Sequence, residues 1–181
     1  MKNVSIILAE GFEELEAVTV IDLLRRAGVA VEVMGLRNMQ ITGAHGITIT
    51  CDDVFDYYGC LDFDGVILVG GMGNATALSE DEGVLKIISE YAEKGKLVAG
   101  ICATPSLVFS ATEILDGKKA TCYPSESLMM GLSGEFVDSP CVVADNIITS
   151  QSPDTAMEFA LTIIQYLGGD AGAVYRALQG K

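Results

Sequence analysis

The stretch VAGICATPS, residues 98–106, joins an apolar run to a Thr-Pro pair typical of a helix start, so it predicts a strand that leads directly into a helix. The run at residues 97–101 is nearly continuous in apolar residues, and so are the runs at 4–9 and 65–69. Strands of this kind are buried on both faces, as in a parallel sheet that helices cover on each side. Further β-rich runs predict strands at residues 30–35, 119–122 and 146–149.

Segments with helical periodicity alternate with these strands, at residues 14–27, 82–94, 103–112, 154–167 and 171–179. Ser79 and Asp154 are expected near helix starts, and helices are expected to end at Gly28, Gly95 and Gly168. The stretch ITGAHGITIT, residues 41–50, alternates in polarity and contains glycines, which is typical of a peripheral hairpin. Together these elements predict a doubly wound α/β fold in a single domain over residues 1–181.

Composition and charge exclude several classes of protein. Half of the 181 residues are hydrophobic and a fifth are charged, which is typical of a globular chain. Lys and Arg number 11 against 25 Asp and Glu, and a net charge of −14 disfavours nucleic acid or an anionic membrane as partner. The N-terminal MKNVSIILAEGFEE has no signal-cleavage pattern and no long apolar span, so we expect a cytoplasmic protein.

The cysteines and the histidine restrict the chemistry further. The five cysteines contain no CxxC pair, so free thiols are expected at positions 51, 60, 102, 122 and 141. His45 is the only histidine, which argues against a metal site and against any mechanism that needs two imidazoles. Its glycine-flanked position is typical of a surface or turn residue.

Cys102 is a candidate nucleophile. In an open α/β sheet, ligands bind beyond the carboxyl ends of the strands, where the loops EGFEE, GGMGN and CATPS follow residues 9, 69 and 101. At a strand-to-helix junction the helix dipole favours a thiolate, and GICAT partly matches the nucleophile elbow GxSxG, with Thr104 at the final glycine. The alternative is that Cys102 is a packing residue at the end of a core strand, because free cysteines are often buried.

The expected helix at 14–27 carries acidic residues where apolar ones belong. Glu13 and Glu16 fall within its apolar arc, and Glu14 lies at the edge of that arc, where it can reach water. Burial would raise the pKa of Glu16 and make it a proton carrier. The alternative is that these carboxylates only suit the helix dipole and project into solvent.

The loop VGGMGNA can offer backbone N–H groups to an anion or a developing oxyanion, and Gly70, together with Glu13 and Tyr123, is a candidate pocket residue. It fails as a dinucleotide fingerprint, because the third small residue is missing at the required spacing. A plain glycine-rich turn is the alternative. Tyr123 follows a strand end and can donate a phenolic hydrogen bond, although a half-buried structural tyrosine is the commoner outcome.

The blocks GFEELEAV, VILVGG, VAGICATPSLV, ATCYPS and TSQSPDTAMEFAL, in this order, resemble the ThiJ/PfpI superfamily along essentially the whole chain. Within it they resemble the branch of the human parkinsonism-associated protein deglycase and its bacterial relatives. The resemblance implies a flavodoxin-like, class I glutamine amidotransferase-like three-layer sandwich and a homodimer. It also implies that Cys102 is the reactive thiol, that protonated Glu16 hydrogen-bonds it, and that Gly71 and Ala103 lend backbone N–H groups.

Several positions depart from the family pattern. Many relatives place a histidine where this chain has Tyr123, so any step assigned to that imidazole is in doubt. Val69 replaces a usual proline, and Ser152 and Asp154 replace two glycines. Related peptidases carry a histidine directly after the nucleophile, where this chain has Ala103. Related amidotransferases use a histidine downstream, whereas no histidine follows position 45.

Cleavage of an amide needs a general acid, which this chain lacks in the form of a suitable histidine. These departures therefore favour a small substrate that is already electrophilic. The resemblance implies a cofactor-free enzyme that acts on a small carbonyl substrate, namely a reactive dicarbonyl such as methylglyoxal or glyoxal, or on early adducts of these compounds. The alternative is an oxidative-stress sensor or protective, chaperone-like protein that uses oxidation of Cys102 to a sulfinate. A family member that has lost activity is a third possibility, and the sequence leaves all three open.

Overall fold

The computed structural model describes residues 2–181 and has a seven-stranded central sheet in the order β10-β11-β7-β6-β1-β2-β5. The strands are β1 (Asn3–Leu8), β2 (Ala30–Gly35), β5 (Asp53–Val54), β6 (Gly65–Leu68), β7 (Leu97–Ile101), β10 (Cys141–Ala144) and β11 (Ile147–Ser150). Every neighbouring pair is parallel except β10 and β11, which form an antiparallel edge. The predicted mostly parallel sheet is therefore confirmed.

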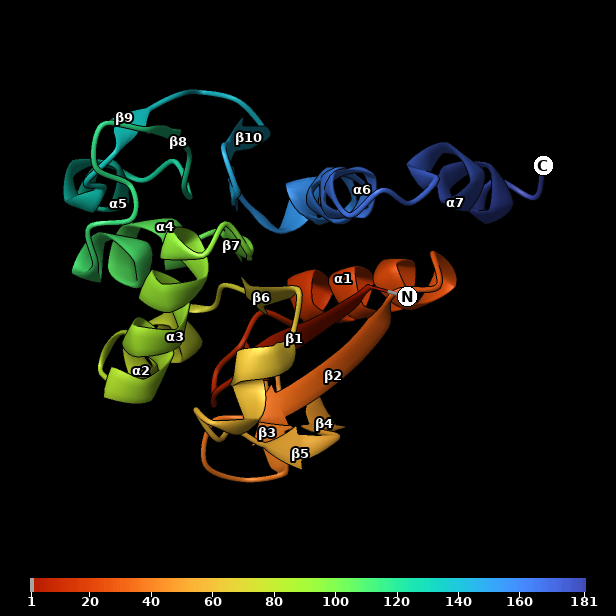
Figure 1. Ribbon diagram of the computed structural model, residues 1–181, viewed down its shortest axis with the longest axis horizontal. Helices are drawn as coiled ribbons and strands as arrows, with labels where there is room; N and C mark the ends of the chain where they lie inside the picture. Colours follow the sequence, from red (N-terminus) through yellow and green to blue (C-terminus); the bar gives the residue numbers. More distant parts are fainter. Residues whose placement is uncertain (1) are drawn as a thin grey trace.

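Helices cover both faces of this sheet. They are α1 (Glu14–Arg26), α2 (Met72–Ser79), α3 (Glu82–Glu93), α4 (Thr104–Leu107), α5 (Glu126–Gly131), α6 (Ala156–Tyr166) and α7 (Ala171–Leu178). Short 3₁₀ turns are η1 (Gly59–Asp62), η2 (Phe109–Ala111) and η3 (Pro153–Thr155). Figure 1 shows α1, α6 and α7 on one side of the sheet and α2, α3 and α4 on the other. The three-layer, flavodoxin-like sandwich predicted from the sequence is confirmed.

Side chains of the buried strands point alternately to the two faces of the sheet, and they form two hydrophobic cores. In β1, Ile6 faces the core that contains Phe159 of α6, whereas Ile7 faces the core that contains Ile88 of α3. Successive side chains of a strand point to opposite faces, so one apolar run can serve both layers. This explains why the continuous apolar runs predicted central strands correctly.

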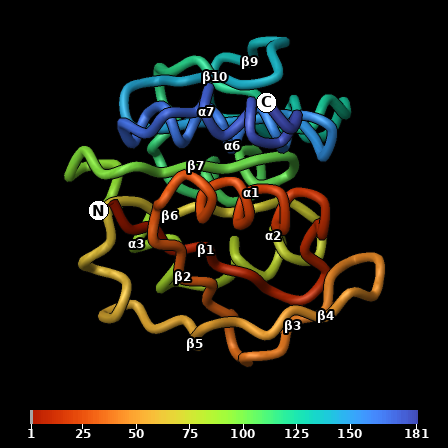
Figure 2. Tube along the Cα trace, turned by 90° about the vertical axis from the view of Figure 1, so that its right-hand side faces the viewer, coloured from red at the N-terminus to blue at the C-terminus, as the bar shows by residue number. Residues whose placement is uncertain are grey.

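The hairpin expected within residues 41–50 forms from β3 (Gln40–Thr42) and β4 (Thr48–Thr50), which pair antiparallel. Its loop projects at the periphery in Figure 2 and docks on the segment before α1. Gly11 N–H donates to the Thr42 carbonyl at 2.8 Å, and Ala44 N–H donates to the Phe12 carbonyl at 2.8 Å. The hairpin is thereby attached to the segment that leads into the acidic residues of α1.

Several elements differ from the sequence prediction. The helix expected at 103–112 is α4 followed by η2, and α2, α5 and β10 were not predicted. Ser79 ends α2, and Asp81 caps α3 because its carboxylate accepts from the N–H groups of Gly83 and Val84. The strand expected at 119–122 is only β8 (Lys119–Ala120), which pairs with β9 (Glu135–Phe136) outside the central sheet. Short elements carry too few residues to establish a period.

Helix ends at glycine follow the prediction, since Gly28, Gly95 and Gly168 all adopt positive φ just after α1, α3 and α6. Asp154 lies in η3, directly before α6. In the part of the chain that the structure describes, no helix has the length and apolar character needed to cross a membrane.

Candidate active site at the carboxyl ends of the central strands

Three loops converge because β1, β6 and β7 are neighbouring parallel strands. The loop after β1 leads to Glu13 and α1, the loop after β6 contains Gly70 and Gly71, and β7 runs directly into Cys102. Parallel strands bring their carboxyl ends to one edge of the sheet. The fold therefore brings the predicted site residues of these three loops together.

Cys102 occupies a strained turn. Its φ is +65°, a left-handed conformation that costs a residue with a side chain roughly 1–2 kcal/mol. Two backbone hydrogen bonds hold it there: its N–H donates to the Ser150 carbonyl of β11 at 3.0 Å, and its carbonyl accepts from the Tyr123 N–H at 2.8 Å. The thiol is half-buried. This is the strand–turn–helix geometry of a nucleophile elbow.

Gly70 makes the close approach of Cys102 and Glu16 possible. A Cβ at this position would lie 2.9 Å from the Cys102 sulfur and 2.7 Å from Glu16 Oε2. Its N–H donates to Glu16 Oε2 at 2.6 Å, and its carbonyl accepts from Glu13 N–H at 3.0 Å. The absence of a side chain at residue 70 is therefore a condition for the site.

Glu16 is fully buried in this site. Within residues 2–181, its Oε1 atom has no hydrogen-bond partner. Burial raises the pKa of Glu16 to about 7, against the opposing effects of Gly70 N–H and the Cys102 thiol, and the charge of Glu13 adds to the rise. A carboxyl with this pKa exchanges protons near neutral pH, which suits a proton carrier.

The Cys102 pKa moves in the direction opposite to our sequence prediction. Burial, together with the negative charge and hydrogen bond of Glu16, raises the pKa of the thiol to about 12. The backbone N–H groups of Gly71 and Ala103 lower it, but less strongly. The lowering expected from the sequence is not found, because burial and the charge of Glu16 outweigh these two N–H donors. The direction of this shift favours the protonated thiol, with the Glu16 carboxyl beside it.

Gly71 and Ala103 line the pocket beside Cys102, and their backbone N–H groups act to lower the pKa of its thiol. Gly71 has a φ of +88°, and a Cβ there would collide with the Gly11 carbonyl. Only glycine has both the freedom to adopt this positive φ and the missing side chain that the nearby Gly11 carbonyl requires. These two donors can serve an oxyanion that forms next to the sulfur.

A pocket of about 590 Å³ opens over the thiol. It is lined by Glu13, Ala44, Gly71, Met72, Cys102, Ala103, Tyr123, Ser125, Ser127, Leu128 and Pro153. Glu13 is the N-cap of α1 and not part of the helix, and Tyr123 is exposed. A larger hollow of about 720 Å³, between α3 and the residues around η2, contains no cysteine. The candidate reactive thiol therefore opens into the smaller of these two pockets.

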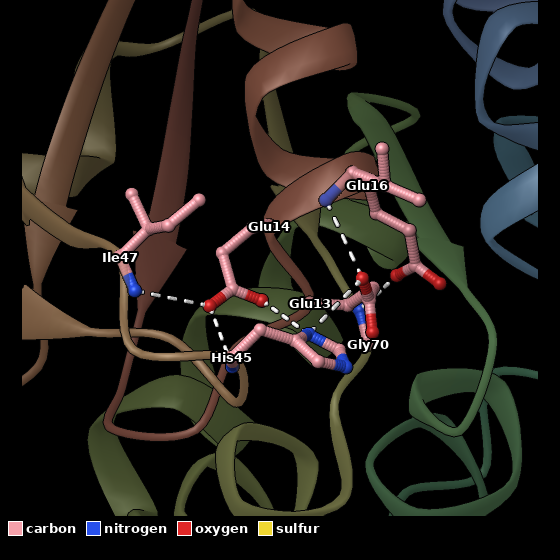
Figure 3. A network of polar contacts seen from close by, with 7 residues as sticks. Glu13, Glu14, Glu16, His45, Ile47 and Gly70 are labelled. Carbon is pink, nitrogen blue, oxygen red and sulfur yellow. Dashed lines mark hydrogen bonds and ion pairs between the residues drawn. The ribbon is translucent and has the colours of Figure 1, made fainter.

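Glu14 and His45 form a contact that the sequence did not predict. Glu14 was expected to reach water, but it is only 5% exposed. Its carboxylate accepts from His45 N–H at 2.7 Å, from Ile47 N–H at 3.4 Å, and pairs with His45 Nδ1 at 2.8 Å, as Figure 3 shows. The two residues are 31 positions apart, so only the docked hairpin could reveal the contact.

These contacts shift both pKa values. Burial acts to raise the pKa of Glu14, but hydrogen bonds from the His45 side chain and from backbone N–H groups outweigh it and lower the pKa to about 2. The bond to Glu14, followed by the charge of Glu13, raises the pKa of His45. The pair is a charged contact that fastens the hairpin to α1.

Glu13, Glu14 and His45 also form a possible cation site. Within residues 2–181 they are the one group whose potential ligand atoms all lie within 4.8 Å of one another. Both Glu14 oxygens already accept hydrogen bonds from the hairpin, however, so a cation would have to replace the Glu14–His45 contact. The arrangement is that of a hydrogen-bonded network (Figure 3).

The fold and this site define an α/β protein with a cysteine at a nucleophile elbow. Residues 2–166 match the DJ-1/PfpI family, so the chain belongs to that family, as its motifs predicted. Protein dj-1beta of Drosophila melanogaster is 37% identical over 170 residues, which cover 93% of this chain and 90% of that protein.

Two further relatives show how far the similarity extends. Protein DJ-1 homolog B of Arabidopsis thaliana is 35% identical over 174 residues, 96% of this chain but 40% of that protein. The chain therefore spans less than half the length of this relative. Among solved structures, oxidized Toxoplasma gondii DJ-1 has a TM-score of 0.93 at 29% identity, covering 99% of this chain and 97% of that one.

Proposed function

We propose that this protein is a cysteine-dependent, cofactor-free enzyme that converts reactive dicarbonyls, such as methylglyoxal and glyoxal, or their early protein adducts, to hydroxy acids. The observation that carries the proposal is the convergence of Cys102 and Glu16 on Gly70, whose missing side chain allows both groups to approach. A thiol with a buried base beside it is an activated nucleophile. The proposed reaction requires no imidazole, which fits a chain whose one histidine is His45.

In the proposed reaction, the Glu16 carboxylate takes the thiol proton as the Cys102 sulfur adds to the aldehyde carbon. The resulting hemithioacetal oxyanion accepts hydrogen bonds from Gly71 and Ala103 N–H groups. Glu16 then moves protons between the two carbon atoms and their oxygens through an enediol, which gives a thioester of the hydroxy acid. Water hydrolyses the thioester and restores the thiol, so methylglyoxal and water yield lactate with no redox partner.

The test is lactate formation from methylglyoxal by wild type, Cys102→Ala and Glu16→Gln. Each variant is expected to lose at least about a hundredfold in rate. Cys102→Ala removes the nucleophile, and Glu16→Gln removes general acid–base catalysis, which alone contributes on this scale. Cys141→Ala is the matched control, since Cys141 is a half-buried thiol that does not line the pocket. Full activity in Cys102→Ala or in Glu16→Gln would contradict the mechanism.

A second candidate function is redox sensing or stress protection through the same thiol. It is supported by the partial exposure of Cys102 and by the solved structure of oxidized Toxoplasma gondii DJ-1. Two equivalents of peroxide would convert the thiol to a sulfinate and release two waters, with protonated Glu16 donating to the sulfinate. Mass spectrometry after mild peroxide would find two added oxygens on Cys102, while the reduced protein would show no turnover of methylglyoxal.

The assembly and the compartment are also part of the proposal. We infer that two copies of this single-domain chain form a homodimer, and that the protein is located in the cytoplasm. Exposed apolar side chains on α1 and the adjacent hairpin, Leu15, Val18 and Ile47, support association of two copies. Light scattering on the purified protein would give twice the chain mass of 19.1 kDa, and a monomer would contradict this assembly.

A further inference from the structure

The pocket over Cys102 carries negative charge without a basic residue to balance it. Of the residues that line it in the described chain, none is Lys or Arg, and Glu13 contributes a carboxylate. The site below adds the charge of Glu16 once that carboxyl ionises, with a pKa of about 7. An anionic molecule entering this pocket would therefore meet like charges at short range.

His45 does not cancel this charge. Its Nδ1 atom lies 3.8 Å from Glu13 Oε1, but it lies 2.8 Å from Glu14 Oε2. Figure 3 shows the single imidazole facing both carboxylates. One imidazolium opposite two carboxylates leaves a net negative charge, even when the ring is protonated. The Glu13 side chain is only 13% exposed, so water screens it incompletely.

We propose that Glu13 selects the molecules that reach Cys102 by charge, so that the site takes neutral or cationic carbonyl compounds and disfavours anionic ones. The apolar part of the lining, with Met72, Leu128 and Pro153, suits an uncharged substituent on the carbonyl compound. The substrate class rests on the function proposed above. The charge preference itself does not, because it applies to any reagent that reaches the sulfur.

Alkylation of Cys102 tests the charge preference without turnover. Iodoacetamide and iodoacetate form the same S–C bond and release iodide, and they differ chiefly in charge. Their rate constants at pH 8 would be read from the Cys102 peptide by mass spectrometry. Each would be divided by the rate constant for free 2-mercaptoethanol, which removes the intrinsic difference between the reagents.

We expect this normalised preference for iodoacetamide to be about tenfold or more, since two charges several ångströms apart at a protein surface interact on that scale. Glu13→Gln should lower the preference several-fold while keeping an acceptor at the helix cap. Glu82→Gln removes the same charge from an exposed position outside the pocket, so the preference for iodoacetamide should stay unchanged. No preference in wild type, or the same preference in Glu13→Gln, would overturn the proposal.

A second arm reads the substrate class. The anionic dicarbonyl 4,5-dioxopentanoate and its neutral methyl ester share one reacting group. We expect kcat/KM to favour the ester by about tenfold, and Glu13→Gln to narrow the difference. If neither compound is turned over but the alkylation preference holds, the proposed activity fails and the charge selection stands. Equal turnover of both compounds by wild type would overturn the selection of substrates by charge.

Discussion

Glu14 and Glu16 lie in the same first turn of α1, are both buried, and yet have pKa values shifted in opposite directions. Glu14 accepts hydrogen bonds from three groups of the docked hairpin, which outweigh its burial and lower its pKa to about 2. Glu16 has one N–H donor, at Gly70, and burial raises its pKa to about 7. The two pKa values differ because Glu14 lies near the surface with more hydrogen-bond donors, whereas Glu16 lies deeper in the protein with one N–H donor.

The largest effect is expected from Gly70→Ala, which removes the space that Glu16 and Cys102 share. The new Cβ would lie 2.5 Å from the Cys102 Cβ and would destabilise the fold by about 3 kcal/mol, at the upper end for overpacking. Urea unfolding measures the loss. Gly59→Ala is the control, because its Cβ would meet nothing nearer than 3.6 Å. Equal stability of the two variants would contradict the close approach.

The second prediction concerns Glu16→Gln and pH. The unfolded chain loses the Glu16 proton near the ordinary value of 4.5 and the folded chain near 7, so wild-type stability falls as pH rises between these values. The amide does not titrate. The stability of Glu16→Gln relative to wild type should therefore increase by about 3 kcal/mol from pH 4 to pH 8. Urea unfolding at both pH values checks this, and a constant difference would contradict the raised pKa.

The third prediction concerns Glu14→Gln, for which the pH dependence of stability has the opposite sign. The variant should lose about 2 kcal/mol of stability at neutral pH, because charged hydrogen bonds to His45 and Ile47 are replaced by neutral ones. The folded pKa of about 2 lies below the ordinary 4.5, so the wild-type advantage should be lost as pH falls from 4.5 to 2. Urea unfolding across this range measures it.

His45→Gln should have the smallest effect on stability. It removes the other partner of the same contact, so its loss of stability is compared with that of Glu14→Gln. The ring is largely exposed, so removing it should cost less stability than removing the buried carboxylate. The raised pKa of His45 means that its contribution is complete below pH 6.5 and is lost as pH rises through the folded value. A loss larger than that of Glu14→Gln would reverse the roles assigned to the two partners.

The parts of the fold that the sequence predicted are those with long, regular periods. The buried runs placed β1, β6 and β7 correctly, and the apolar arc of the first helix indicated that Glu16 faces the core. The prediction for Glu14 was wrong because the hairpin that covers it is distant in sequence. The short helix α2 was missed because its eight residues carry no clear apolar face.

The amino-acid sequence alone was enough to predict the central strands β1, β6 and β7, the first long helix, the family, and the position of Cys102 at the end of a central strand. The direction of the Cys102 pKa and the opposite pKa shifts of Glu14 and Glu16 could be found only from the folded structure. The physical reason is that periodicity reports which face of an element is buried. A pKa depends on donors and charges within a few ångströms, and here these come from loops far apart in the chain.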